Sequence, residues 1–266
     1  VNNSIDTRGG NFTVAGSNTS GSRSEAFQAN AGSFTTGSGI SIFTDGDTDV
    51  ASGNISINTA VVNGSSGHIT LGGRLSTGGG VSSGATGIDG GDITLTVDTT
   101  AGDITAHQLF AKGSNGNDTG GTGGNITLST GSGTITLTQG VNNISGANDG
   151  GTRPSSGAIT FNDAVTLSTN AISIETTTTD QANGGNITFQ SSIDGSQDLT
   201  IRSGSGTVTI AGAIGATTPL TSLKINDSDT VHAGTITLSG NIGGGSAGVS
   251  GATAIGNTIT GTLTLG

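Results

Sequence analysis

Hydrophobic and polar residues alternate along most of the chain, in short runs separated by Gly, Ser and Asn. One pattern recurs: a Gly, a polar residue, and then three residues of the type Ile-Thr-Leu, as at Gly91-Asp92-Ile93-Thr94-Leu95. The first and third residues of the Ile-Thr-Leu type share one face of a strand, and Thr or Ser takes the other face. The pattern therefore predicts β-strands of about five residues, and nothing between them has helical spacing.

Copies of this pattern run through the whole chain. They begin at Gly53, Gly67, Gly91, Gly124, Gly133, Gly157, Gly185, Gly206 and Gly234. The copies whose first apolar residues are Ile93, Ile126, Ile159 and Ile187 recur at similar intervals, and each follows a Gly-rich or polar loop. Repetition on this scale is the sequence sign of a solenoid.

The repeat predicts an all-β fold, a right-handed parallel β-helix (a β-solenoid) with irregular coil length and Gly-rich loops. Each inward Ile, Leu or Val would stack on its counterpart about 4.8 Å away in the next coil. At roughly 25–33 residues per coil we expect about eight to ten coils, with the loops in a row along one edge. We also expect the loops at 78–90, 113–123 and 145–156 to tolerate insertions. The alternatives are a set of small β domains and an antiparallel sandwich, and a sandwich needs longer strands and larger inward residues.

Composition supports a solenoid over a compact core. The chain has 51 Gly and no Cys, Met, Trp or Tyr, so its apolar groups are small and evenly spread. The net charge of −11 reflects only seven Lys and Arg, too few to neutralise a nucleic-acid backbone. No apolar run approaches the ~20 residues of a membrane span, so we expect no membrane insertion. Because Val1 and Gly266 both lie in the repeat pattern, we expect residues 1–266 to form one continuous segment, an internal piece of a longer repeat protein.

A family resemblance adds a functional expectation. The stretches IDGSQDLTI at 193–201, GSGTVTI at 204–210 and TTPLTSLKI at 217–225 resemble repeats of large bacterial β-helical exoproteins. The stretch IDTRGGNFT at 5–13 resembles the companion motif of filamentous-haemagglutinin-like adhesins. The resemblance implies a secreted structural or adhesive rod on the bacterial cell surface, extracellular, and involved in cell adhesion or in a fibre. Its partners would be flanking repeats of the same chain or copies docked end to end, together with a host-cell or polysaccharide receptor.

One acidic cluster is a candidate metal site. Asp45, Asp47 and Asp49 alternate in a short loop, and alternating carboxylates can gather oxygen ligands around Ca²⁺. A solvated turn is the competing interpretation, because Val50 and Ser56 stand where an EF-hand loop has Gly and Glu. No other cofactor is predicted.

We do not expect an enzyme. The G-x-S-x-G matches at 80–84 and 244–248 lie in Gly/Ser loops without the strand and helix that a nucleophile elbow needs. His68, His107 and His232 lack metal-ligand spacing, and the basic residues are dispersed along the sequence. Two alternatives to the adhesive rod remain: a polysaccharide-binding or polysaccharide-degrading β-helix, and an ice-binding solenoid presenting the Thr-x-Thr pairs. Of the ten glycosylation sequons, those at Asn54, Asn125 and Asn186 follow the repeat Gly, where turns already favour Asn.

Overall fold

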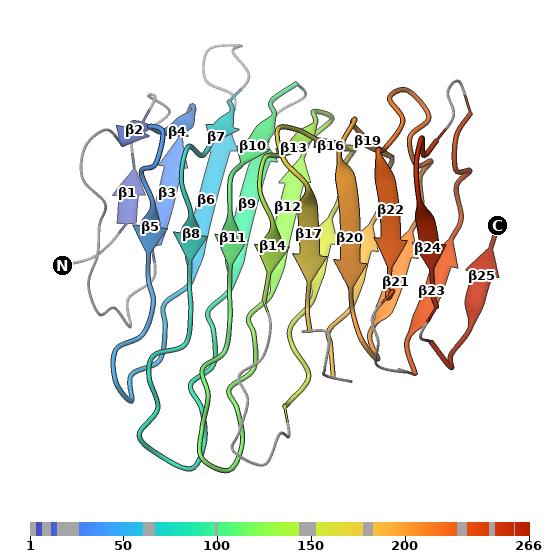
Figure 1. Ribbon diagram of the computed structural model, residues 1–266. Helices are drawn as coiled ribbons and strands as arrows, with labels where there is room; N and C mark the ends of the chain where they lie inside the picture. Colours follow the sequence, from blue (N-terminus) through green and yellow to red (C-terminus); the bar gives the residue numbers. More distant parts are fainter. Residues whose placement is uncertain are drawn as a thin grey trace.

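The chain folds into parallel sheets stacked as a β-solenoid (Figure 1). The computed structural model describes residues 4–6, 12–14, 27–60, 67–98, 101–143, 153–177, 183–227, 233–244, 248–257 and 259–266, and these contain strands and turns but no helix. All named strands pair in parallel, in three sheets that we call A, B and C. The predicted all-β parallel fold is therefore confirmed.

The three sheets form three faces of the coil. Sheet A consists of β1 (Ser4–Asp6), β3 (Phe27–Ala31), β6 (Ile55–Ala60), β9 (Ile93–Asp98), β12 (Ile126–Thr130), β15 (Ile159–Phe161), β18 (Ile187–Phe189), β21 (Thr207–Ile210), β23 (Thr235–Leu238) and β25 (Leu263–Leu265). Sheet B consists of β2 (Phe12–Val14), β4 (Phe34–Thr36), β7 (Ile69–Thr70), β10 (Ile104–Ala106), β13 (Ile135–Leu137), β16 (Val165–Leu167) and β19 (Ile193–Asp194). Sheet C consists of β5 (Ile42–Phe43), β8 (Leu75–Ser76), β11 (Leu109–Phe110), β14 (Val141–Asn142), β17 (Ile172–Glu175), β20 (Asp198–Arg202), β22 (Ser222–Ile225) and β24 (Thr253–Ile255).

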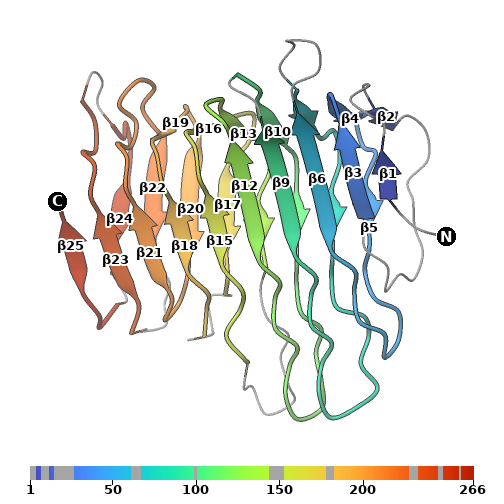
Figure 2. The same ribbon diagram turned by 180° about the vertical axis from the view of Figure 1, so that it is seen from behind.

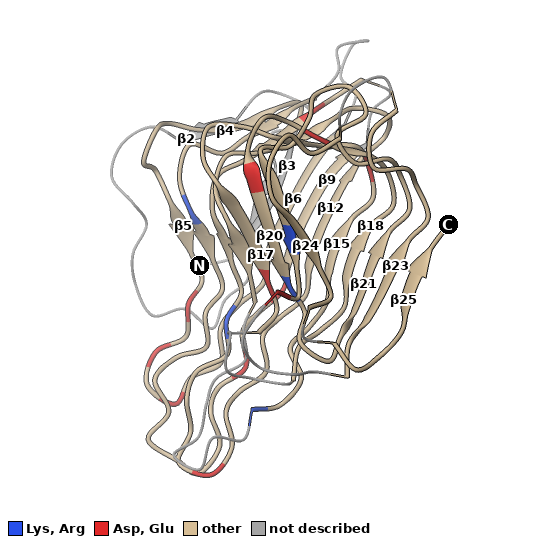
Figure 3. Ribbon diagram, turned by 45° about the vertical axis from the view of Figure 1, so that its right-hand side comes forward, with Lys and Arg blue, Asp and Glu red and all other residues tan. Residues whose placement is uncertain are grey.

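The chain passes through sheets A, B and C in order and then begins the next coil. Six successive coils, from β3–β4–β5 to β18–β19–β20, have a named strand on all three faces. These six are fewer than the expected eight to ten coils. In the two following coils sheets A and C continue, but the sheet B position is held only by single bridges, Ile193 with Ile214 and Ile214 with Ile242. Figure 2 shows sheet A from the opposite side, and the oblique view in Figure 3 shows the coils lying one behind another. At about 4.8 Å per rung, the ten strands of sheet A span about 43 Å, which gives the molecule the shape of a short rod.

Strand pairing confirms the predicted equivalence of the repeat copies. Ile93 pairs with Ile126, Ile126 with Ile159, and Ile159 with Ile187, all in sheet A. The pattern also occupies a second face, since Ile69 and Ile135 belong to sheet B.

Coil length varies more than predicted. At the corner before sheet A, Asn54 bonds to its counterpart Asp92 in the next coil, and the two residues are separated by 38 positions. The equivalent bonded pair, Asn186 and Thr207, is separated by only 21 positions. The loops absorb this difference, because the strands keep their register on both sides of it.

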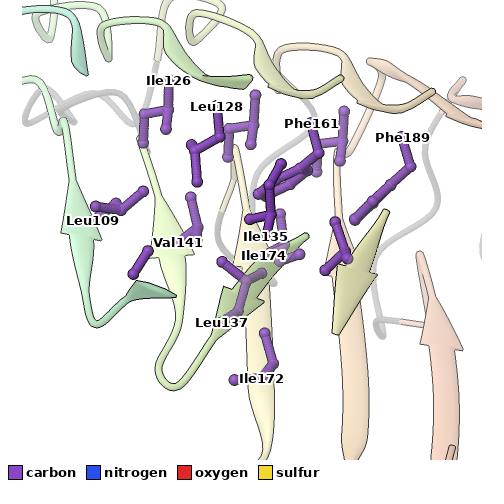
Figure 4. Packing of buried hydrophobic residues seen from close by; sticks show 14 of the residues in the cluster. Leu109, Ile126, Leu128, Ile135, Leu137, Val141, Phe161, Ile172, Ile174 and Phe189 are labelled. Atoms are coloured by element: carbon purple, nitrogen blue, oxygen red, sulfur yellow. The ribbon is translucent and has the colours of Figure 1, made fainter. Parts of the chain in front are cut away.

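The interior is a stack of aliphatic and aromatic side chains (Figure 4). Ile126, Leu128 and their partners in the neighbouring coils are completely buried. Phe161 and Phe189, partners in adjacent rungs, stack with ring centroids 4.7 Å apart and an interplanar angle of 17°. Because every rung covers the next, small side chains suffice to exclude water along the rod.

The Gly and Asn of the repeat shape the corner that precedes sheet A. A Cβ at Gly185 would lie 1.9 Å from the carbonyl oxygen of Gly157 in the previous coil, so only glycine allows this close approach. The Asn that follows the repeat Gly links neighbouring coils. Asn125 Oδ1, for example, accepts a hydrogen bond from the N–H of Ala158 at 2.9 Å. Three of the sequon asparagines stand in this column: Asn54, Asn125 and Asn186, whose side-chain oxygens each accept a backbone N–H of the next coil.

The Gly-rich loops between sheets C and A do form a row along one edge, as predicted (Figure 1). They also continue the stack. The N–H of Gly87 donates to Thr119 O at 2.7 Å, and the N–H of Ser114 donates to Ile88 O at 2.9 Å. An insertion at 78–90 or 113–123 would break such bonds, so the expected tolerance does not follow for these two loops. Most of the third loop, 145–156, lies outside the described residues.

Candidate functional site

Two faces of the rod present columns of threonine. On sheet A, register places seven threonines in consecutive rungs at an outward position: Thr94, Thr127, Thr160, Thr188, Thr209, Thr237 and Thr264. On sheet B five threonines do the same: Thr35, Thr70, Thr105, Thr136 and Thr166. The outward residue of the repeat thus makes both columns uncharged and nearly uniform.

Sheet C differs from the other two faces. Its outward positions include aromatic and charged residues, and four of the five described Lys and Arg residues lie on its strands or within two residues of them (Figure 3). The fifth, Arg153, lies in the loop between β14 and β15. We call the four side chains on sheet C the basic face: Arg74, Lys112, Arg202 and Lys224. They are dispersed in the sequence, but each coil returns the chain to the same face. Sequence reasoning missed this site because residue spacing alone does not show which positions share a face.

Arg74 is held between two aromatic rings from the coils on either side of it. Its guanidinium carbon lies 5.0 Å from the ring centroid of Phe43 and 5.3 Å from that of Phe110. The position between these rings on sheet C is Ser76, a small residue that leaves room for the guanidinium. Lys112 Nζ lies 4.6 Å from the Phe110 centroid. Phe110 therefore makes cation–π contacts with two basic side chains.

Farther along sheet C, Glu175 and Arg202 occupy paired positions on adjacent strands and form an ion pair and hydrogen bond. Ser173 Oγ also donates to Glu175 Oε1 at 2.6 Å. Burial lowers the pKa of Lys112, an effect that Glu175 opposes and Arg153 reinforces. Sheet C therefore carries acidic as well as basic side chains.

The acidic loop has a different organisation from a closed metal site. Asp45 Oδ1 accepts hydrogen bonds from Ser76 Oγ at 2.6 Å and from the N–H of Gly78 at 2.5 Å. Asp47 Oδ1 accepts the N–H of Thr48 at 2.8 Å. Among the described residues, no group of three or more His, Cys, Asp or Glu side chains is close enough to hold a metal ion.

Asp49, the third residue of this loop, has a positive φ of 56° and bonds to the next coil. Its carboxylate accepts the hydroxyl and the N–H of Ser83, and these hydrogen bonds lower the pKa of Asp49. Each carboxylate therefore has its own donor, as in a hydrogen-bonded turn. The Ca²⁺ site formed by Asp45, Asp47 and Asp49 stays a prediction.

The residues considered for catalysis have structural partners. The N–H of Asp103 donates to His68 Nδ1 at 3.0 Å, and His107 Nδ1 lies 3.1 Å from Thr138 Oγ1. Ser82 Oγ donates to the carbonyl oxygen of Thr86 at 2.5 Å within its own loop. His232 and the serine of the second G-x-S-x-G match, Ser246, lie outside the described residues. The absence of enzymatic activity stays a prediction.

Two sequon asparagines that the sequence did not distinguish are buried structural residues. Asn143 Nδ2 donates to the carbonyl oxygens of Gly124 at 2.7 Å and Gly157 at 2.8 Å. Asn226 Oδ1 accepts the N–H of Ser203 at 2.8 Å. Both side chains bind backbone groups at the corners between sheets C and A, where glycosylation would require local unfolding.

Comparisons with protein-family models, with curated proteins and with solved structures give no match. The resemblance to filamentous-haemagglutinin-like adhesins is therefore a hypothesis based on the stretches quoted above. Within the described part of the chain, no helix could cross a membrane.

Proposed function

We propose that this chain is a structural and adhesive rod segment of a bacterial cell-surface or secreted protein. The observation that supports this function is the unbroken parallel stack in which one face, sheet C, departs from the threonine columns of the other two. A stack of this kind can hold two parts of a protein at a fixed distance from each other, and a distinct face along it can bind a ligand. Localisation outside the cell is part of the proposal and follows from the family resemblance.

The proposed partners at the ends of the rod are further rungs. Leu263 and Leu265 lie on β25, the last strand of sheet A, and are 43% and 68% exposed. In the preceding strand their partners Ile236 and Leu238 are buried. Another rung, from the same polypeptide or from a second copy docked end to end, would bury these leucines and pair the edge of β25.

Surface labelling tests the proposed location. Antibodies raised against the purified chain should label intact cells that produce the parent protein, and external protease should remove the label. Labelling that appears only after the cells are permeabilised would contradict an extracellular rod. A cytosolic marker protein, probed in parallel, controls for cell lysis.

A second candidate function is ice binding, which one feature of sheet A favours. Thr207 pairs with Thr235, and Thr209 with Thr237, so the last rungs carry two threonine columns side by side. Thr262 and Thr264 continue both columns on the last rung, because Leu263 between them pairs with Ile236. A regular hydroxyl array of this kind could order water. The test is thermal hysteresis of the chain against a Thr209→Lys/Thr237→Lys variant, and the absence of hysteresis in the unaltered chain would eliminate this candidate.

A further inference from the structure

We propose that the basic face of sheet C binds a linear acidic polysaccharide that runs parallel to the rod axis. This proposal specifies the ligand of the adhesive rod and therefore rests on the proposed function. Sheet C is the face to consider because four of the five described Arg and Lys residues lie on its strands or within two residues of them, in a chain whose net charge is −11. Arg74 and Lys112, which share the ring of Phe110, together create a local positive potential on an otherwise acidic molecule.

Three of the four positive charges of this face are available to a ligand. Within the described residues, Arg74, Lys112 and Lys224 form no ion pair with a carboxylate. Three carboxylates on or near sheet C are instead engaged by the following coil. These are Asp45 with Ser76, Glu175 with Arg202, and Asp198 with Ser222. The ion pair with Glu175 engages Arg202, so Arg74, Lys112 and Lys224 are the cations left for an external anion.

The arrangement of the cations matches a polymer better than a compact anion. Arg74 directly precedes β8, Lys112 follows β11, and Arg202 and Lys224 lie on β20 and β22, so the cations belong to different rungs. Arg74 and Lys112 belong to adjacent rungs about 4.8 Å apart, and two rungs without a Lys or Arg, β14 and β17, separate them from Arg202 and Lys224. A small dianion needs several cations converging on one point. A linear polyuronate, with a carboxylate on each sugar unit, meets cations that are spread along a line.

The aromatic contacts restrict the position of the Arg74 side chain before a ligand binds. Phe43 and Phe110 hold the guanidinium of Arg74 between them, which reduces the side-chain entropy lost when a ligand binds. The planar guanidinium can still donate two parallel hydrogen bonds to a carboxylate. Lys112 is partly buried against Phe110, and a charge in such an environment is less screened by water.

The same contacts disfavour an anionic membrane as the ligand. Membrane-binding surfaces combine basic residues with aromatic or aliphatic side chains that insert among the lipids. Here Arg74 and Lys112 lie over the rings of Phe43 and Phe110, so these rings are engaged by cations. Charge complementarity along the rod therefore points to an acidic glycan.

The test measures binding of the purified chain to immobilised polygalacturonate, with dextran as the neutral polymer and phosphatidylglycerol vesicles as the membrane probe. We expect binding to polygalacturonate that weakens with added salt, and little binding to dextran or vesicles. The variant Arg74→Gln/Lys112→Gln/Lys224→Gln should bind about tenfold more weakly, since each exposed charge contributes a modest share. The matched control, Thr70→Gln/Thr105→Gln/Thr136→Gln on sheet B, should bind like the unaltered chain.

A gain-of-binding variant keeps the test decisive if the triple variant fails to fold. Gln108 stands next to Arg74 on the adjacent rung, so Gln108→Lys adds a cation to the face and should strengthen binding. No binding to polygalacturonate, equal binding by all variants, or binding to vesicles alone would overturn the proposal. Binding is measured on the purified chain and export on whole cells, so failure of the ligand proposal and failure of the extracellular location give different results.

Discussion

A Cβ placed on Gly124 would lie 2.1 Å from the carbonyl oxygen of Gly91, its counterpart one coil earlier. The two glycines occupy the corner before sheet A, where successive backbones approach most closely. Gly124→Ala should therefore force the coils apart and destabilise the fold by about 1–3 kcal/mol, the usual cost of overpacking. Urea unfolding followed by circular dichroism measures the change.

Gly84 provides the control for this substitution. A Cβ at Gly84 would meet only Ser82 Oγ, at 3.9 Å. Gly84→Ala should change the free energy of unfolding by no more than about 0.5 kcal/mol. Equal effects of the two substitutions would contradict the close approach of successive backbones at the corner before sheet A.

The inward and outward faces of a strand can be tested at neighbouring positions. Ile126 is completely buried, whereas Thr127 points outward in the sheet A column. Ile126→Asp would bury a carboxylate without a partner and should cost several kcal/mol or prevent folding. Thr127→Asp should be tolerated within about 1 kcal/mol. Similar thermal stabilities for the two variants would contradict the assignment of faces.

The periodic part of this fold could be predicted from sequence, and the irregular part could not. The positions of Ile93, Ile126, Ile159 and Ile187 were sufficient to predict rungs that stack, because alternation and a repeated spacing are local features of the sequence. The basic face depends on more than spacing. Arg74 and Lys112 are distant in the sequence, and they share a face only because the intervening coil has a particular length. That length varies from coil to coil with the loops, whose cross-coil hydrogen bonds have no sequence pattern of their own.

Substitution of the buried Asn143 tests how much a polar side chain stabilises the corner before sheet A. Asn143→Ala would remove the side-chain donor to the carbonyl oxygens of Gly124 and Gly157, and should cost about 1–3 kcal/mol. Asn162 is an exposed asparagine directly after β15, and Asn162→Ala should be nearly neutral. The two variants are compared by their midpoints in urea. A neutral Asn143→Ala would mean that these carbonyl groups find other donors.

Addition of Ca²⁺ distinguishes the two interpretations of the acidic loop, a Ca²⁺ site and a solvated turn. Because Asp45, Asp47 and Asp49 each accept hydrogen bonds from different donors, we expect millimolar Ca²⁺ to leave the Tm of the chain unchanged. A cation that binds only the folded state would raise the Tm by mass action. A rise that disappears in an Asp45→Asn/Asp47→Asn/Asp49→Asn variant would instead establish the Ca²⁺ site.

The most direct test of the stacked rod is a set of distances along its threonine column. The chain has no Cys, so spin labels can be attached at Thr94→Cys paired in turn with Thr188→Cys, Thr209→Cys and Thr237→Cys. These pairs are three, four and five rungs apart on sheet A. Pulsed electron paramagnetic resonance should give distances of about 14, about 19 and about 24 Å, in steps of about 4.8 Å.

The last two increases in distance, from Thr188 to Thr209 and from Thr209 to Thr237, distinguish stacked coils from a chain whose distances depend on the number of intervening residues. They should be equal, even though the chain between Thr188 and Thr209 is shorter than the chain between Thr209 and Thr237. Distances that grow with the length of the intervening chain, or that do not increase along the series, would contradict a rod built from stacked coils.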